Sequence, residues 1–183
     1  MHYTIEKGQE NFLSEQRPDF IKHTEELQEV DGQSNHYPGS KELMAISASF
    51  SKSFGLNRIG IHHELLPPGR RTSWPHCHST DEEFVYVIEG NPDIWIDGKL
   101  YRLVPGDAVG FSPGTGISHT AINNTQKDVR LLVVGDARRP GDRGFYPVTP
   151  EGNALAESRN RLWTDAPKHN LGPHDGLPDA MKR

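Results

Sequence analysis

The stretch HCHSTDEEFVYVIEG, residues 76–90, places two histidines two positions apart, just before a run typical of a β-strand. Side chains alternate along a strand, so His76 and His78 would project to one face and Cys77 to the other. Two imidazoles on one face can bind a single metal ion, at about 2.1 Å from each nitrogen. Glu83 follows after a short turn and can reach back beside them. The stretch therefore indicates either a metal site or a polar turn that leads into a buried strand.

A further candidate ligand, His119, follows the glycine-rich segment PGTGIS at residues 113–118. It would start another strand that can pair in the same sheet system. Imidazole and carboxylate ligands together suit first-row metals such as iron, manganese, nickel or zinc.

Residues 41–135 carry nearly all of the strand signal in the chain. Short alternating runs are separated by Gly, Pro and Asp turns, at intervals typical of an all-β sandwich or barrel. Asp97-Gly98 lies between two such runs and predicts a tight hairpin. Little room is left for crossover helices, so the strands should be antiparallel and should form a closed barrel or a double-sheet jelly roll.

The run LNRIGIHHELL, residues 56–66, alternates with Ile59, Ile61, His63 and Leu65 on one face. If that face lines the interior, His63 would be a substrate contact or would support a metal ligand. The simpler interpretation is a core histidine with a backbone hydrogen-bond partner.

Composition limits the class of protein. The chain has 183 residues, enough for one domain, and its formal net charge of −5 argues against a nucleic-acid partner. Cys77 is the single cysteine, and no run approaches the roughly 20 apolar residues of a membrane span. The N-terminus lacks a basic-then-apolar signal. We therefore expect a cytoplasmic protein with no membrane partner.

The ends of the chain differ in character from its centre. Residues 1–40 are polar and are interpreted as an N-terminal extension, with a short helix over residues 23–30. Residues 41–137 are taken as the β-barrel domain. Residues 138–183 are rich in Gly and Pro and should wrap irregularly around the core, with a helical turn near residues 153–163.

The middle of the chain resembles the cupins, a superfamily of small β-barrels with two short motifs. The first motif, with its His-x-His pair, is similar to Gly69, His76, His78, Glu83 and Gly90. The second motif is similar to Gly106, Pro113, Gly116, His119 and Asn123. The spacing departs from the pattern by one residue before His76 and on each side of Pro113, which lengthens loops without moving ligands. The resemblance covers residues 69–123 and implies a cupin-type double-stranded β-helix, or jelly-roll, barrel.

The resemblance also implies a set of metal ligands. The family's ligands correspond to His76, His78, Glu83 and His119. Glu82 is an alternative to Glu83, but the six-residue interval to Gly90 favours Glu83. Four protein ligands leave two positions open on an octahedral ion, and open positions mark a working rather than a structural site. We expect one divalent transition metal per chain, Zn, Mn, Fe or Ni.

Three functions fit such a site. A Lewis-acid metal acting on a hydroxy-carbonyl substrate would support isomerisation or epimerisation of a sugar or sugar phosphate. Arg58, Arg70 and Arg71 near the first motif favour this function, because they could receive an anionic substrate. The alternatives are an iron or manganese dioxygenase and a non-enzymatic, metal-dependent small-molecule binding protein.

The expected partners are a small-molecule substrate and a second copy of the chain. The apolar segment LMAISASF, residues 43–50, has few evident partners in the core and predicts a homodimer interface.

Overall fold

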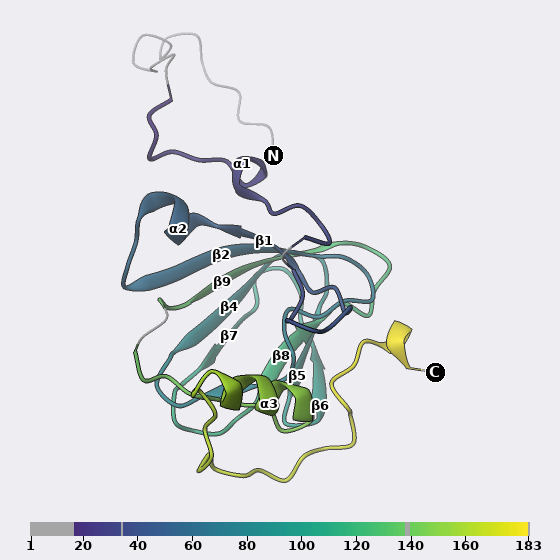
Figure 1. The fold of residues 1–183 in the computed structure, drawn as a ribbon. Coiled ribbons are helices and arrows are strands. Elements are labelled where there is room, and N and C mark those ends of the chain that lie inside the picture. Colours follow the sequence, from purple (N-terminus) through teal and green to yellow (C-terminus); the bar gives the residue numbers. More distant parts are fainter. Residues whose placement is uncertain (1–16, 34, 138–139, 183) are drawn as a thin grey trace.

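Antiparallel strands make up most of the regular structure in the computed structural model, which describes residues 17–33, 35–137 and 140–182 (Figure 1). The strands are β1 (Ile46–Ser49), β2 (Ile59–Leu66), β3 (Cys77–His78), β4 (Glu83–Glu89), β5 (Asp93–Ile96), β6 (Lys99–Arg102), β7 (Ala108–Phe111), β8 (His119–Ile122), β9 (Val129–Asp136) and β10 (Gly144–Phe145). The helices are α1 (Thr24–Leu27), α2 (Phe50–Phe54) and α3 (Pro150–Ser158), and a 3₁₀ turn spans Asp179–Met181. Part of the predicted N-terminal extension, residues 1–16, lies outside the described residues.

The strands form a five-stranded sheet in the order β1-β2-β9-β4-β7, a three-stranded sheet β6-β5-β8, and the pair β10-β3. All the named pairings are antiparallel. The core joins the two larger sheets, because Val87 of β4 and Leu131 of β9 pack in one cluster with Ile94 of β5 and Ala121 of β8. The prediction of an all-β jelly roll is confirmed. Hydrogen bonding among the described strands gives separate sheets rather than one closed cylinder.

The predicted hairpin at Asp97-Gly98 joins β5 to β6. Both turn residues have positive φ angles, 45° and 82°, as a two-residue turn of this kind requires. The chain tail lies against this turn, since the Gly172 amide donates to the Asp97 carbonyl over 2.7 Å. A side chain at position 98 would collide with the Gly172 backbone. Glycine is therefore required here twice, for the turn and for the packing of the tail.

The inward face of β2 is the opposite of the one that the sequence predicted. Leu66 is fully buried in the core, and strand alternation puts Glu64 and His62 on the same face. Ile59, expected inside, is 40% exposed. His63 pairs laterally with Ala48 and Leu132 on the other face. The alternation of apolar residues predicted the wrong inward face because the inward positions near one end of β2 are polar residues or glycine. The structure does not bring His63 between the sheets.

The segment predicted as a dimer interface packs within its own chain. Met44 and Ala48 are buried, and Ala45 belongs to the core cluster. The outer edge of β1 is covered by the chain near α1, where the Glu29 amide donates to the Ser47 carbonyl over 2.9 Å. The apolar character of this segment is therefore explained without a second copy.

The chain before β1 and the C-terminal extension meet at Arg71, which is 3% exposed. Its Nε and Nη2 atoms donate to the Glu42 carboxylate over 2.6 and 2.8 Å, and Nη1 donates to the Gly176 carbonyl over 2.8 Å. Trp74 Nε1 donates to the same carboxylate. One buried guanidinium thus joins the chain before β1 to the C-terminal tail.

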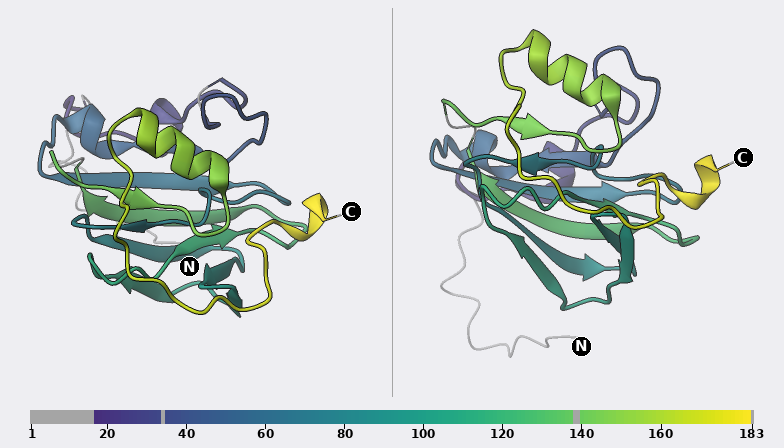
Figure 2. Two further views of the ribbon diagram at one scale, coloured as in Figure 1. Left: turned by 60° about the horizontal axis from the view of Figure 1, so that its bottom comes forward. Right: turned by 90° about the horizontal axis from the view of Figure 1, so that it is seen from below.

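Each extension contains one helix where the sequence predicted helical structure, although the bounds differ from the predicted ranges 23–30 and 153–163. The short N-terminal helix is α1, capped by His23. The helical turn in the C-terminal part is α3, which begins at Pro150, a residue favoured in the first turn of a helix. The tail after α3, yellow in Figure 2, runs round the outside of the strands to the C-terminus. No helix within the described ranges is long and apolar enough to cross a membrane.

Candidate metal centre

Four side chains from separate parts of the chain converge at one end of the space between the sheets. His76 and His78 lie at β3, Glu83 begins β4 and His119 begins β8. Glu83 Oε2 lies 2.9 Å from His119 Nε2, and 3.9 Å from Nε2 of both His76 and His78. Paired backbone hydrogen bonds hold His76 beside His119. The structure brings together the four side chains that the cupin resemblance singled out.

The other ring nitrogens of the histidines face acceptors. His76 Nδ1 lies 2.8 Å from the Trp74 carbonyl oxygen, and His78 Nδ1 lies 2.8 Å from Asp142 Oδ2. A proton on Nδ1 leaves the Nε2 lone pair of each ring facing Glu83, which is the arrangement a metal ligand needs. His119 instead makes its shorter contact through Nε2, so metal binding at this nitrogen would require the proton of the neutral ring to lie on Nδ1. Phe111 stacks on the His119 ring, with centroids 3.5 Å apart, and fixes its plane.

Burial and hydrogen bonding set the charges of the site. Burial and the neighbouring His78 lower the pKa of His76 to about 4, so this ring is neutral at pH 7. Burial raises the pKa of Glu83, but the hydrogen bond from His119 and the nearby imidazoles outweigh it and hold the pKa well below its usual range. An anionic carboxylate among imidazoles is a donor set that fits a divalent first-row metal.

Asp142 is a part of the site that the sequence did not predict. Its side chain is 2% exposed and accepts hydrogen bonds from the Thr80 amide and from His78. Burial lowers the pKa of His78, but the Asp142 carboxylate more than offsets this, and the net pKa is raised. The carboxylate therefore orients the His78 ring and increases its basicity. Asp142 follows the strand segment and matches neither short motif, so no spacing signal pointed to it.

His78 also belongs to a second cluster, with Asp81 and Asp142, whose candidate ligand atoms lie within 4.8 Å of one another. The two ring nitrogens of His78 face different partners, because Nε2 points to Glu83 and Nδ1 to Asp142. We regard this second cluster as the support of the first.

Two neighbouring residues that could have been metal ligands, Glu82 and Cys77, do not face the histidines. Glu82 is exposed, and its amide bonds to Asp136 rather than to the histidines. Cys77 is buried against Trp163 and faces away from His76 and His78, and burial raises the pKa of its thiol. A neutral, buried thiol is neither a ligand nor a nucleophile.

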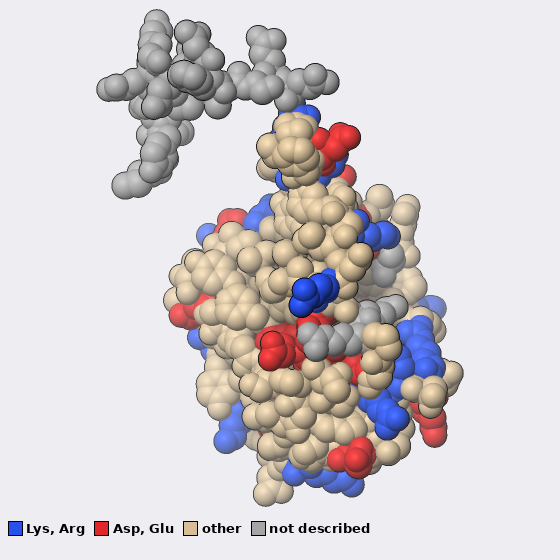
Figure 3. All heavy atoms as spheres, turned by 90° about the vertical axis from the view of Figure 1, so that its left-hand side faces the viewer, with Lys and Arg blue, Asp and Glu red and all other residues tan. Residues whose placement is uncertain are grey.

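A cavity of about 540 Å³ adjoins the cluster. Strands, the N-terminal segment and the C-terminal part all line it; the residues used below are Gly60, His62, His78, Glu83, Gly135, Tyr146, Arg159 and Arg161. On the face seen in Figure 3, acidic side chains gather at the centre with basic side chains above and beside them. The cavity therefore has a polar lining of mixed charge.

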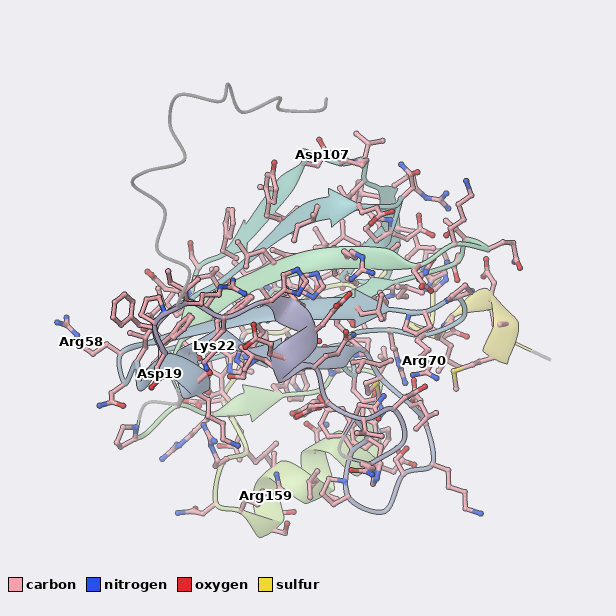
Figure 4. All side chains as sticks on the ribbon, turned by 90° about the horizontal axis from the view of Figure 1, so that it is seen from above. Asp19, Lys22, Arg58, Arg70, Asp107 and Arg159 are labelled. Atoms are coloured by element: carbon pink, nitrogen blue, oxygen red, sulfur yellow. The ribbon has the colours of Figure 1, made fainter. Side chains whose placement is uncertain are left out.

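Two of the three arginines predicted to receive a substrate, Arg70 and Arg71, are engaged elsewhere. Arg70 pairs with Asp31 over 2.8 Å, and Arg71 is the buried clasp described above. Arg58 lines a second cavity, of about 730 Å³, together with Glu83, and Arg159 is the C-cap residue of α3 (Figure 4). Arg159 and Arg161, both from the tail, line the cavity instead. Contact with an anionic group stays a prediction for Arg58, and the cavity adds Arg159 and Arg161 as candidates.

Comparison with known proteins identifies the class of protein. Residues 62–135 match the family model described as the cupin domain. This chain therefore carries a domain of the cupin superfamily, with histidine and glutamate side chains that could hold a metal ion. No curated protein sequence matches the chain.

Three solved structures are similar to the chain. A sugar phosphate isomerase of the cupin superfamily from Silicibacter pomeroyi is 32% identical, with a TM-score of 0.54, over 56% of this chain and 64% of that protein. A candidate sugar phosphate isomerase from Acidithiobacillus ferrooxidans is 26% identical, with a TM-score of 0.60, over 70% and 81%. A predicted oxalate decarboxylase from Thermotoga maritima is 20% identical, with a TM-score of 0.52, over 64% and 99%, and this likeness supports the fold alone.

Proposed function

We propose that this protein is a metal-dependent isomerase or epimerase of a phosphorylated sugar. His76, His78, Glu83 and His119 would hold one divalent metal. The proposal draws support from the two proteins named as sugar phosphate isomerases, at 32% and 26% identity. When bound, the metal would supply a Lewis acid that polarises the substrate carbonyl.

The observation that carries the proposal is the pair of tail arginines beside the candidate ligands. Arg159 is exposed at the cavity, and its guanidinium makes no hydrogen bond or ion pair with the described residues. Arg161 lies 3.5 Å from Asp142, so it is already partly paired. A free guanidinium at a polar cavity suits a phosphate group, which it can bind through two parallel hydrogen bonds.

The cavity walls would hold the rest of the substrate. Tyr146 stacks against His76 with ring centroids 5.6 Å apart, and it lines the cavity. The sugar would lie between this wall and Glu83, with its phosphate at the mouth near Arg159. Packing of this kind orients a substrate and excludes water from the reacting carbons.

The test pairs elemental analysis of the purified protein with proton–deuterium exchange. Hexose and pentose phosphates are incubated with the metal-loaded protein in deuterium oxide, and exchange next to the carbonyl is followed by NMR. Exchange together with aldose–ketose or epimer conversion supports the proposal. Dioxygen uptake with iron in the site would replace it with a dioxygenase. Binding without exchange or uptake would replace it with a binding protein.

The role of Arg159 has its own test. Arg159→Gln should raise KM for the phosphorylated sugar at least tenfold and leave kcat within about twofold, because a remote binding contact is lost. The exposed Arg130, which pairs with Glu89 on β4, gives the matched control Arg130→Gln. Equal effects of both variants would contradict a phosphate-binding role.

The homodimer stays a prediction. Because residues 43–50 pack within the chain, an interface would have to use another surface. Light scattering at micromolar concentration decides the point, and a monomer there would contradict it.

A further inference from the structure

Three linked side chains on the inner face of the five-stranded sheet lead from the core to the cavity. Ser47 of β1 lies opposite Glu64 of β2, and His62 is two positions along β2 on the same face. Ser47 Oγ lies 3.2 Å from His62 Nδ1, and the Ser47 side chain also hydrogen-bonds to that of Glu64. One hydroxyl thus connects an imidazole with a carboxyl group.

His62 directs its other nitrogen towards the cavity. The next row of the sheet consists of Gly60, Gly135 and Glu83, side by side on β2, β9 and β4. A Cβ atom on Gly60 would lie 3.7 Å from His62 Nε2, which places that nitrogen over the glycine row. Neither glycine has a side chain to fill the space in front of Glu83. Nε2 of His62 therefore faces the part of the cavity above the two glycines, beside the candidate metal centre.

The spacing of the strands fits a small substrate between these groups. His62 and Glu83 come from strands separated by β9, and adjacent strands lie about 4.8 Å apart. The two backbones are therefore roughly 10 Å apart. A sugar carbon chain can therefore lie above Gly60 and Gly135, with Glu83 on one side of it and His62 on the other.

We propose that His62 carries the proton between the two reacting carbons, with Ser47 and Glu64 as positioning residues behind it. The inference rests on the proposed isomerase function. Nε2 takes the proton from the hydroxyl-bearing carbon, the C–H electron pair forms a carbon–carbon double bond, and the carbonyl π pair moves to its oxygen. His62 then returns the proton to the former carbonyl carbon, and the hydroxyl proton passes to the other oxygen. No oxidant or reductant is needed.

The ionisation of His62 and Glu64 agrees with this role. Burial lowers the pKa of His62, so its ring is neutral at pH 7 and can accept a proton. Burial raises the pKa of Glu64 to about 7, and the charged groups that act on it are Glu29 and Glu83. A proton gained at Nε2 can be matched by transfer from Nδ1 to Ser47 and from Ser47 to Glu64.

The deciding comparison is His62→Gln against His63→Gln, which changes the neighbouring histidine on the opposite face of β2. His62→Gln should lower proton exchange on the sugar phosphate at least 100-fold, with bound metal, melting temperature and substrate Kd near wild type. His63→Gln should retain exchange. Exchange that survives in His62→Gln overturns this inference alone. Wild-type protein that exchanges no sugar phosphate overturns the proposed function, and the inference with it.

The roles of Ser47 and Glu64 are tested by the tautomer of His62 and by the pH dependence of the rate, neither of which should change if the two residues only support the fold. Imidazole ¹⁵N shifts should place the proton of neutral His62 on Nδ1 in metal-free wild type, and Ser47→Ala should abolish that preference. Ser47→Thr, which keeps the hydroxyl, should restore both the shift and the rate. Glu64→Gln should move the acid limb of the rate profile. An unchanged tautomer and profile in these variants would remove the positioning role.

Discussion

The two ends of the central strands have opposite character. On β4, Val85 and Val87 are buried in the core, whereas Glu83 at the start of the strand faces three histidines. On β9, Leu131 is fully buried, whereas Gly135 leaves room beside that carboxylate. A single strand thus contributes to the core at one end and to the candidate metal centre at the other.

The difference separates stability from binding along each strand. Apolar burial contributes about 25 cal/mol per Å², so the core end contributes most of the folding free energy. Burial of imidazoles and a carboxylate costs free energy unless they are paired. Substitutions at the core end should therefore destabilise the protein without changing the site. Substitutions at the polar end should change metal binding with a smaller effect on the metal-free fold.

The largest effect should come from the core end. Leu131→Ala should lower the free energy of unfolding of metal-free protein by about 2–5 kcal/mol, because it leaves a cavity in a packed cluster. Urea unfolding measures this, and the folded variant should still bind one metal ion. The control is Ile88→Ala on the neighbouring strand β4, because the Ile88 side chain is 44% exposed. Equal losses in the two variants would break the comparison.

Metal removal should have the next largest effect. With metal at 100 times its Kd, binding adds about 2.7 kcal/mol to stability, and a chelator should lower Tm by about 5–10 °C. His119→Ala or Glu83→Ala should abolish most of this difference, whereas Glu82→Ala should preserve it. If chelated and metal-containing wild type melt together, after elemental analysis has confirmed the metal, the bridging role is refuted.

A change in the support of the site should have a smaller effect. Asp142→Asn should weaken metal binding 10- to 100-fold, because His78 loses the carboxylate that orients it. The raised pKa of His78 contributes stability that is present below its unfolded pKa of about 6.5 and is lost as pH rises through the higher folded pKa. Asp142→Asn should remove that contribution. Calorimetry and an NMR titration of His78 measure both effects, and an unchanged Kd would contradict the support role.

At Glu64 the expected effect is confined to a pH dependence of stability. Its folded pKa of about 7 exceeds the ordinary value, so the stability it contributes is full below about pH 4.5 and is lost as pH rises towards 7. Glu64→Gln should therefore raise the free energy of unfolding at pH 8, relative to its effect at pH 5, by on the order of 2–3 kcal/mol. Urea unfolding at the two pH values checks this. An equal effect at both would mean that Glu64 ionises normally.

The parts predictable from sequence were those encoded by local spacing. His76, His78 and Glu83 fall within eight residues, and strand alternation alone places both histidines on one face. The Asp97-Gly98 turn was equally local. The cupin pattern added His119, which a lone spacing argument would have left as one loop histidine among several.

The remainder depended on contacts between distant segments. Asp142 reaches His78 across 64 positions of sequence, and the tail arginines reach the cavity only because the chain returns across it. The prediction of which face of β2 points inward was wrong for another reason. A functional end replaces inward apolar residues by His62 and glycine, so hydrophobic alternation points to the wrong face.

The Arg71 clasp bears on which stretch of this chain forms the folding unit. The family match covers residues 62–135, yet Arg71 within it donates its hydrogen bonds to Glu42 and Gly176, which lie outside it. A chain trimmed to the matched stretch would lose every one of these hydrogen-bond partners, together with the two segments that carry them. We therefore expect the smallest stable fragment to be longer than the matched stretch, and grafting only the matched strands onto another protein would transfer the candidate ligands without the Arg71 contacts.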